Sequence, residues 1–314
     1  MLFSILIPVF NEINHIDDLI SDMIKMHPFE KEIFLIDGGS TDGTRQKIEK
    51  WSSSNNSIKL IINEKKFVSF GFNKAYKVTN GKYIGFLGAH AHYPINFLKS
   101  AQIELDSNSC DAIGGPLNQI GITKIGQAVA FAMSSKFGVG DSDFRVLKER
   151  KYVQSVAFAV YKKEIFEKIG LLDEDLIRNQ DDEFHYRLNK NGFRMLMIPE
   201  MQCNYYVRDN LKLLFKQYFE YGLYKPLVFK KLNYGLKYRH IIPSLFVFYI
   251  VMLPISLISS LYLIPLFLYL LIIFCVTVFN CKTLTVKFWI PMVLFTLHFS
   301  YGLGFILGVN KKTN

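Results

Sequence analysis

Cysteine is scarce in this sequence, and no two cysteines form a Cys-x-x-Cys pair. The four that occur are Cys110, Cys203, Cys275 and Cys281. Structural zinc sites use closely spaced cysteine and histidine pairs, and small secreted domains use a regular framework of cysteines. The sequence therefore predicts neither a zinc site nor a disulfide scaffold, and this cysteine usage is typical of a cytoplasmic protein.

Two long stretches near the C-terminal end contain no Asp, Glu, Lys or Arg. They cover residues 241–281 and 288–309, and His298 is the only histidine within them. A helix needs about 20 apolar residues to cross a bilayer core. We expect two membrane spans from the first stretch and a third from the second, with buried core helices as the alternative. A channel or transporter is disfavoured because no charged residue marks an ion path.

Positive charge is concentrated just before the first uncharged stretch. The net charge is +10, and residues 208–239 contain eight basic side chains against Asp209 and Glu220. This distribution is typical of a cytoplasmic segment that meets anionic membrane lipids, and it disfavours nucleic acid as the partner. The first ten residues have no basic region and only a short apolar run, so we expect no signal peptide and a cytoplasmic catalytic part.

The first ninety residues alternate between two hydrophobic patterns. Short apolar runs predict buried strands over 3–9, 32–36, 58–62 and 83–87, and helical spacing predicts helices over 14–26, 45–51 and 70–78. This alternation predicts an α/β fold with a mostly parallel sheet and helices on both faces.

Polar clusters directly follow three of these strands, at residues 11–12, 37–42 and 88–92. Ligands bind outside the carboxyl ends of parallel strands, so we expect the three clusters to form one site. Farther along the chain the pattern predicts strands over 152–161 and 195–198. It also predicts helices over 165–169 and 182–191, the second ending at Gly192.

Three segments resemble the family-2 inverting glycosyltransferases, which have the GT-A fold. They are Pro8-Val-Phe-Asn-Glu12, Asp37-Gly-Gly-Ser-Thr-Asp-Gly-Thr44 and Gln180-Asp-Asp-Glu-Phe-His-Tyr-Arg-Leu188. Two further segments are similar to the branch typified by succinoglycan-type β-glucosyltransferases, namely Gly88-Ala-His-Ala-His-Tyr-Pro94 and Gln217-Tyr-Phe-Glu-Tyr-Gly222. The resemblance covers residues 2 to about 225. Each motif alone is weak, but their order and spacing make the set specific.

The resemblance implies a UDP-sugar donor. Pro8, Phe10 and Glu12 would line the uridine pocket, and Asp37 would contact the base or the ribose. Gly39 lies in a loop where glycine lets the backbone approach a nucleotide closely and tolerates positive φ. A plain surface turn is the alternative for this loop.

A cluster of adjacent acids begins at residue 181. In an inverting transfer one carboxylate removes the proton from the acceptor hydroxyl. The resemblance places this base on Asp181, with Asp182 as the alternative, and puts Gln180, Glu183 and Gln217 on the acceptor side. An acidic first helical turn, favoured by the helix dipole, is the structural alternative for the cluster.

The segment after the fourth predicted strand lacks the carboxylate pair with which most GT-A enzymes hold a divalent metal. Gly88 and His90 stand at those two positions, and His92 follows. Imidazole suits Mn²⁺ better than Mg²⁺, so a metal held by His90 favours Mn²⁺. Alternatively, a protonated His90 stabilises the departing diphosphate without metal. We assign His90 and His92 to the donor diphosphate or metal and leave metal independence open.

Together these features predict a GT-A catalytic domain over 1–207, basic aromatic interfacial helices over 208–240 and a membrane domain of three hydrophobic helices over 241–309. We expect a multi-pass membrane protein that moves a hexose from UDP-sugar to a lipid-linked or growing polysaccharide acceptor, and glucose is the expected hexose. The alternative is a catalytically inactive homologue that scaffolds polysaccharide assembly, which the missing carboxylates favour.

The lysines around the uncharged stretches leave the membrane topology open. Three spans would put Lys282 and Lys287 on the cytoplasmic side, as expected for basic residues, but Lys311 and Lys312 on the other side.

Overall fold

The computed structural model describes residues 1–232, 237–281 and 283–311, and these form two compact units. The first unit combines residues 1–118 with 147–205, and the second combines 119–146 with 206–314. Residues 119–146 therefore group with the C-terminal part rather than with the catalytic segment in which the sequence placed them. Lys282 and Lys312 lie outside the described residues.

The first unit is built on an eight-stranded sheet in the order β3-β2-β1-β4-β9-β6-β10-β8. Its strands are β1 (Phe3–Val9), β2 (Lys31–Asp37), β3 (Ile58–Ile62), β4 (Tyr83–Phe86), β6 (Ala112–Gly115), β8 (Lys151–Tyr152), β9 (Ala157–Lys162) and β10 (Met195–Met197). Strands β1 to β4 are mutually parallel, and β10 is parallel to β6. β9 runs antiparallel to both of its neighbours, and β8 is antiparallel to β10. The predicted mostly parallel sheet is confirmed.

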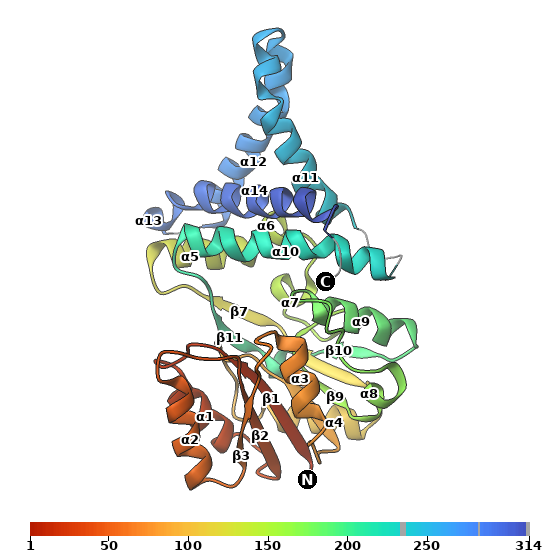
Figure 1. Ribbon diagram of the computed structural model, residues 1–314. Coiled ribbons are helices and arrows are strands. Elements are labelled where there is room, and N and C mark those ends of the chain that lie inside the picture. The colour runs from red at the N-terminus through yellow and green to blue at the C-terminus, as the bar shows by residue number, and fades with distance from the viewer. Residues whose placement is uncertain (233–236, 282, 312–314) are drawn as a thin grey trace. The chain divides into compact units, whose positions relative to one another are not determined.

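Helices cover both faces of this sheet. They are α1 (Ile16–Lys25), α2 (Thr44–Ser54), α3 (Val68–Tyr76), α4 (Phe97–Asp106), α8 (Glu164–Ile169) and α9 (Gln180–Lys190), with a 3₁₀ turn η1 (Pro199–Met201). The strand order reverses after β3, so right-handed crossovers put α1 and α2 on one face and α3 on the other (Figure 1). A small second sheet joins β5 (Ala91–His92), β11 (Cys203–Tyr206) and β7 (Leu117–Ile120) in that order.

Most predicted boundaries in the first ninety residues agree with the structure to within two residues. β1 and β3 match their predicted ranges, and every residue of β2 is buried, as expected for a central strand. The apolar face of α1 (Ile16, Leu19, Ile20 and Met23) is buried. Gly192 follows α9 with φ +80°, which confirms its role in ending the helix. The predicted strand over 152–161 is divided, because residues 153–156 leave the sheet between β8 and β9.

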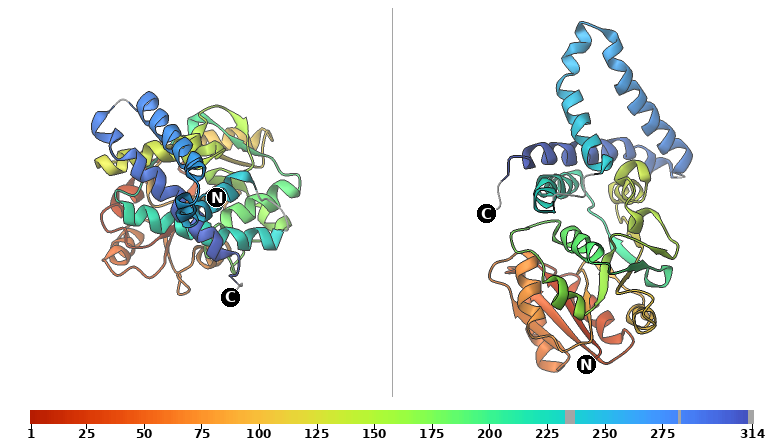
Figure 2. Two further views of the ribbon diagram at one scale, coloured as in Figure 1. Left: turned by 90° about the horizontal axis from the view of Figure 1, so that it is seen from above. Right: turned by 90° about the vertical axis from the view of Figure 1, so that its right-hand side faces the viewer.

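The second unit is helical. Its elements are α5 (Lys124–Met133), α6 (Lys136–Val139), α7 (Asp143–Val146), α10 (Leu211–Leu232), α11 (Tyr238–Val251), η2 (Leu253–Leu257), η3 (Ser260–Leu263), α12 (Ile264–Asn280), α13 (Leu284–Lys287) and α14 (Ile290–Gly308). Two helical stretches, Ser260–Asn280 and Leu284–Gly308, are long and apolar enough to cross a membrane. α11 is apolar but has only 14 residues. Within this unit α11 and α12 form a hairpin (Figures 1 and 2).

Candidate functional site

The carboxyl ends of three parallel strands meet at one edge of the sheet. Val9 pairs with Asp37, and Leu6 pairs with Phe86, so the loops after β1, β2 and β4 leave the sheet side by side. Hydrogen bonds join the first two loops. Thr41 N–H donates to the Asn11 side-chain oxygen at 2.8 Å, and Asn11 N–H donates to Ser40 Oγ at 3.0 Å. The first two predicted polar clusters are therefore in contact.

Glu12 connects all three loops. Its backbone N–H donates to Thr44 Oγ1 at 2.8 Å, and its Oε1 lies 2.8 Å from His90 Nε2. The Glu12 side chain is almost fully buried, yet its Oε2 has no hydrogen-bond partner. A buried carboxylate oxygen without a partner is costly, so this atom has an unused capacity to accept a hydrogen bond. Phe10, two residues earlier, is exposed, and Pro8 is half-buried.

Asp37 is completely buried, and it holds an arginine that sequence reasoning missed. Its Oδ2 accepts from Arg45 Nε at 2.8 Å and from Nη2 at 2.6 Å, and its Oδ1 accepts from Ser40 N–H at 3.0 Å. Burial raises the pKa of Asp37, but the hydrogen bonds from Ser40 and the Arg45 guanidinium outweigh it, so the net pKa is lowered. The Arg45 side chain is 35% exposed. Arg45 is therefore the member of this ion pair that faces solvent.

The loop after β2 needs glycine at positions where a side chain would be strained. Gly39 has φ +90° and Gly43 has φ +97°, both in the left-handed region. Asp42 fixes the end of the loop, because its carboxylate accepts from Ile13 N–H at 3.0 Å and from Thr44 Oγ1 at 2.6 Å. The loop is thus shaped by backbone conformation and local hydrogen bonds. Contact of Gly39 or Asp37 with a nucleotide stays a prediction.

Packing explains why residue 88 carries no carboxylate. A Cβ added to Gly88 would lie 2.3 Å from Cε1 of the Phe158 ring. Phe158, which has φ +54°, also contacts the rings of Tyr93 and Tyr205. The Tyr93 hydroxyl accepts from Gly88 N–H at 2.7 Å and donates to Gly88 C=O at 2.9 Å. This loop is therefore built around a residue with no side chain.

The two histidines of this loop point to different partners. His90 contacts Glu12, and its ring lies with its edge toward His15 at a centroid distance of 6.4 Å. His92 lies in β5, and its Nδ1 is 2.9 Å from Asp22 Oδ2 on α1. His90 is therefore joined to Glu12, and His92 to α1.

The donor set of the loops does not complete a protein-held metal site. Glu12 supplies one carboxylate and His90 one imidazole, while Gly88 supplies none. No three His, Cys, Asp or Glu side chains gather at an ion-binding distance within the part of the chain that the structure describes. Mg²⁺ requires nearly octahedral oxygen coordination, which these two groups cannot provide. Glu12 and His90 alone therefore do not fit a protein-held Mg²⁺ ion.

The acidic cluster forms the first turn of α9, after Asn179 with φ +60°. Asp181 is exposed and Asp182 is half-buried. Glu183 is buried, and its two oxygens accept from Arg187 Nε at 2.6 Å and from Nη2 at 2.8 Å. The acids therefore differ in environment. Asp181 is the most accessible, and Glu183 is held by an ion pair within the helix.

Two of the predicted acceptor-side residues belong to different units. Gln180, the first residue of α9, has its Oε1 buried without a hydrogen-bond partner. Gln217 lies on α10 of the second unit and donates to the Tyr221 hydroxyl at 3.1 Å. The acceptor-side roles of Gln180, Glu183 and Gln217 stay predictions.

A buried histidine behind the acidic turn was missed by sequence reasoning. His185 Nδ1 lies 3.0 Å from Ser155 Oγ, and its Nε2 lies 2.7 Å from the Tyr161 hydroxyl. Burial lowers the pKa of His185 to about 4, against a smaller opposing effect of Asp182. Burial, and then the charge of Asp181, raises the pKa of Tyr161. The hydrogen bond between the neutral Tyr161 and His185 side chains therefore joins the buried face of α9 to β9.

We expect acid to destabilise the first unit through His185. Its pKa in the folded state, about 4, lies below its ordinary value of 6.5. Its contribution is thus complete above pH 6.5 and is lost as the pH falls toward 4, by up to about 3 kcal/mol. Thermal unfolding of wild type and His185→Gln between pH 7.5 and 4.5 measures this. The variant should be less stable at pH 7.5 but lose less stability on acidification, and equal losses would contradict the assignment.

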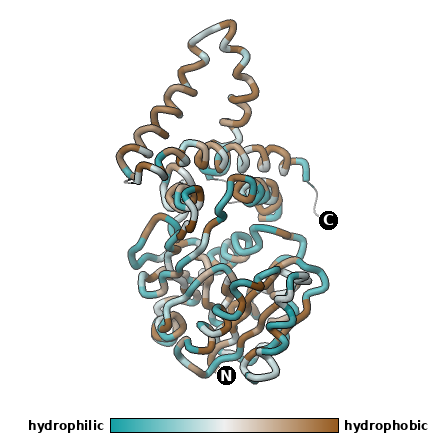
Figure 3. Tube along the Cα trace, turned by 90° about the vertical axis from the view of Figure 1, so that its left-hand side faces the viewer, coloured by the Kyte–Doolittle hydropathy of each residue, from teal (hydrophilic) through white to brown (hydrophobic). Residues whose placement is uncertain are grey.

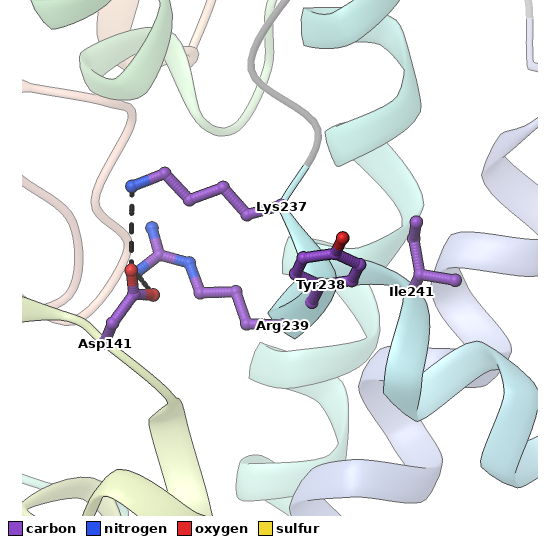
Figure 4. A pocket seen from close by; sticks show the side chains of 5 residues that line it. All are labelled: Asp141, Lys237, Tyr238, Arg239 and Ile241. Atoms are coloured by element: carbon purple, nitrogen blue, oxygen red, sulfur yellow. Dashed lines mark hydrogen bonds and ion pairs between the residues drawn. The ribbon is translucent and has the colours of Figure 1, made fainter.

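The second unit contains a cavity of about 590 Å³ at the start of α11 (Figure 4). It is lined by Asp141, Lys237, Tyr238, Arg239 and Ile241. Arg239 Nη1 lies 2.7 Å from Asp141 Oδ1, and Lys237 Nζ lies 3.7 Å from Asp141 Oδ2. Two cations thus share a single carboxylate, which leaves the lining with a net positive charge.

Comparison with known proteins places the chain in a family. The model of "Glycosyl transferase family 2" matches residues 4–170. The chain is 31% identical to the succinoglycan biosynthesis protein ExoA of Rhizobium meliloti over 221 residues, which cover 69% of this chain and 67% of that protein.

A second relative is similar over nearly its whole length. It is a dolichyl N-acetyl-α-D-glucosaminyl phosphate 3-β-D-2,3-diacetamido-2,3-dideoxy-β-D-glucuronosyltransferase of Methanococcus voltae. The identity is 29% over 318 residues, which cover 98% of this chain and 97% of that one.

Among solved structures, the mannosyltransferase PcManGT from Pyrobaculum calidifontis, in complex with GDP-Man and Mn²⁺, superposes with a TM-score of 0.64. The sequence identity is 15%, and the match covers 94% of this chain and 85% of that one. This likeness confirms the predicted GT-A fold. The fold agrees with the family match over residues 4–170 and with the relative that is 31% identical. The chain therefore belongs to glycosyltransferase family 2, and it is an enzyme of glycan biosynthesis.

Proposed function

We propose that this glycosyltransferase moves a hexose from UDP-sugar to a lipid-linked or growing polysaccharide acceptor, with inversion at the anomeric carbon. Glucose is the preferred candidate for the hexose. The observation that carries the proposal is the first turn of α9. There an exposed Asp181 lies on the same helix, four residues before the buried His185, which is hydrogen-bonded to Tyr161. A catalytic carboxylate has to be accessible while its backbone is held rigidly, and this arrangement meets both conditions.

In the proposed reaction Asp181 removes the proton from the acceptor hydroxyl as that oxygen attacks C1 of the sugar. The bond between C1 and the diphosphate oxygen breaks, and the nucleoside diphosphate leaves with the electron pair. The amino-terminal end of a helix favours a negative side chain, which keeps Asp181 available as a base. Asp182 is the alternative base, since it is adjacent and half-buried.

The Glu12–His90 pair is the proposed contact with the donor. Its buried, unpartnered Oε2 would accept from the nucleotide or sugar, while His90 would stabilise the departing diphosphate. Any divalent ion would rest mainly on the oxygens of the diphosphate, with Glu12 and His90 as the nearest protein donors. Imidazole suits Mn²⁺ better than Mg²⁺, so Mn²⁺ is the preferred ion.

A lipid-linked acceptor is supported from two directions. The relative that matches 98% of this chain is named for a dolichyl phosphate-linked acceptor. The cavity at the start of α11 carries Lys237 and Arg239 beside the hydrophobic helices, where the phosphate of a lipid carrier would find opposite charge. We propose attachment to the cytoplasmic side of the cell membrane through those helices.

One assay tests this function. Purified enzyme in lipid receives UDP-glucose or GDP-mannose with a polyprenyl phosphate-linked sugar, in Mn²⁺, in Mg²⁺ or in EDTA. We expect transfer from UDP-glucose, more in Mn²⁺ than in Mg²⁺, with measurable activity in EDTA that His90→Ala removes. Transfer from GDP-mannose alone would overturn the donor assignment. Nucleotide binding without transfer to any acceptor would favour the inactive scaffold.

A further inference from the structure

α14 has the length and composition of a membrane span, yet it packs backbone to backbone against α10. A Cβ added to Gly304 would lie 2.1 Å from the Phe219 carbonyl oxygen, and one added to Gly308 would lie 2.2 Å from that of Leu223. From the other side, a Cβ on Gly222 would lie 2.1 Å from the Tyr301 carbonyl oxygen. Glycines on both helices thus let the two backbones touch.

α10 cannot lie in the hydrocarbon core. Charged side chains occur along its whole length, at Lys212, Lys216, Glu220, Lys225, Lys230 and Lys231. A charge in the centre of a bilayer is costly, whereas a basic aromatic helix is stable at the surface. Because the backbones of α10 and α14 are in contact, the C-terminal half of α14 has to lie at the depth of these charges.

α14 makes further contacts along its length and just beyond its C-terminal end. Near its middle, His298 Nε2 lies 2.9 Å from the Phe137 carbonyl oxygen of α6, and both α13 and α14 contact α5. After its C-terminal end, Lys311 Nζ stacks 4.2 Å from the centre of the Tyr224 ring of α10. The Lys230 ammonium donates to the Val309 carbonyl oxygen. These contacts hold α14 against other helices of its unit, and at its C-terminal end against the charged helix α10.

The hairpin of α11 and α12 has the opposite character. In the most apolar part of Ser260–Asn280 only 11% of the residues are buried, against 39% in that of Leu284–Gly308. Leu257 and Ile258 at the tip are 90% and 88% exposed. The hairpin is hydrophobic along both arms (Figure 3), and it projects from the layer in which α10 and α14 lie side by side (Figures 1 and 2). Exposed apolar surface of this extent marks a membrane-inserting element.

We infer that only the α11–α12 hairpin enters the bilayer, while α10 and α14 lie flat at the headgroup boundary on the cytoplasmic side. This differs from the three spans expected from composition. The hairpin returns the chain to the side from which it came, so Lys287 and Lys311 lie on the same side as the basic residues of α10. All described lysines near the membrane then obey the positive-inside rule. The inference rests on the proposed membrane attachment and adds its geometry.

Site-directed labelling tests the topology. In a background without the four native cysteines, single cysteines replace Lys50 on α2, Ile258 at the hairpin tip and Asn310 after α14. Sealed proteoliposomes are treated with a membrane-impermeant maleimide, before and after detergent. We expect Asn310→Cys to react from the same side as Lys50→Cys, and Ile258→Cys to react only in detergent. Protection of Asn310→Cys where Lys50→Cys reacts would place α14 across the membrane and overturn the inference.

A matched pair of charge substitutions provides a second measurement. Phe274→Lys lies on α12 and Leu307→Lys on α14, and both side chains are exposed and apolar in the wild type. Retention in liposomes after an alkaline wash is measured, with circular dichroism as the folding control. Phe274→Lys should lose most of its retention, and Leu307→Lys should keep it. The reverse order, or wild-type protein that does not sediment with liposomes at all, contradicts the inference. Wild-type protein that does not sediment with liposomes would also contradict the proposed membrane attachment. It would leave the proposed sugar transfer untouched, because the transfer assay measures that activity separately.

Discussion

Asp181→Asn is expected to abolish sugar transfer while donor binding survives. Asparagine keeps the size and position of the side chain but cannot take a proton, so the loss falls on the chemical step. General-base catalysis typically contributes about 10²- to 10⁴-fold, and we expect kcat to fall within that range. Initial rates at saturating donor and acceptor measure the loss, and calorimetric titration with the nucleotide measures binding.

Asp182→Asn is the matched control because it removes the neighbouring charge from the same helical turn. It is expected to lower kcat far less than Asp181→Asn. Circular dichroism of both variants checks that the fold is kept. Near-normal turnover in Asp181→Asn together with loss in Asp182→Asn would move the base by one residue. Loss of nucleotide affinity in Asp181→Asn would place the residue in donor binding instead.

Gly88→Asp is expected to damage the protein rather than restore a metal-binding carboxylate. The new Cβ would lie 2.3 Å from the Phe158 ring, which is held by Tyr93 and Tyr205. Overpacking of this kind typically costs about 1–3 kcal/mol, and each kcal/mol lowers Tm by about 2–4 °C in a domain of this size. Tm and transfer rate should both fall, and added Mn²⁺ should not restore the rate.

A double-mutant cycle with Phe158→Ala separates the clash from other effects. Truncating the ring opens the space that the aspartate needs, so Gly88→Asp combined with Phe158→Ala should be more stable than the sum of the two single changes predicts. A gain of Mn²⁺ dependence in the double variant would show that the site accepts a metal once Phe158 is gone. Additive losses, or a Gly88→Asp variant as stable as the wild type, would show that the ring yields freely.

Local patterns were sufficient to predict the first half of the sheet. Strands such as β1 are short, apolar and bounded by turn residues, so their ends and the polar clusters beyond them can be placed from the sequence. The contacts made by those clusters could not be placed. The contact of Asp37 with the base or the ribose stays a prediction. Its burial against Arg45 could not be read from the sequence, because burial depends on packing across the loop.

Long-range partners explain the remaining differences. Nothing near residue 88 indicates that a phenylalanine seventy positions later occupies the space of a side chain. His185 stands in an acidic, polar segment, and only its contact with Tyr161 reveals it as a buried neutral histidine. Likewise, composition gives α14 the character of a membrane span. Only the structure shows that its glycines allow close packing against the backbone of α10.

The division of the second unit into two chain segments imposes an order on synthesis. α5 and α6 leave the ribosome early, but α13 and α14, which cover them, are made last, and His298 is 161 residues from its partner Phe137. Until translation ends, the part of the apolar helix α5 that contacts α13 and α14 lacks its native cover. The nascent chain therefore exposes an apolar patch on α5 while residues 147–205, the second segment of the first unit, are made. A chain cut after Arg239 to obtain a soluble enzyme would carry that patch permanently, so shortening α5 as well should reduce its aggregation.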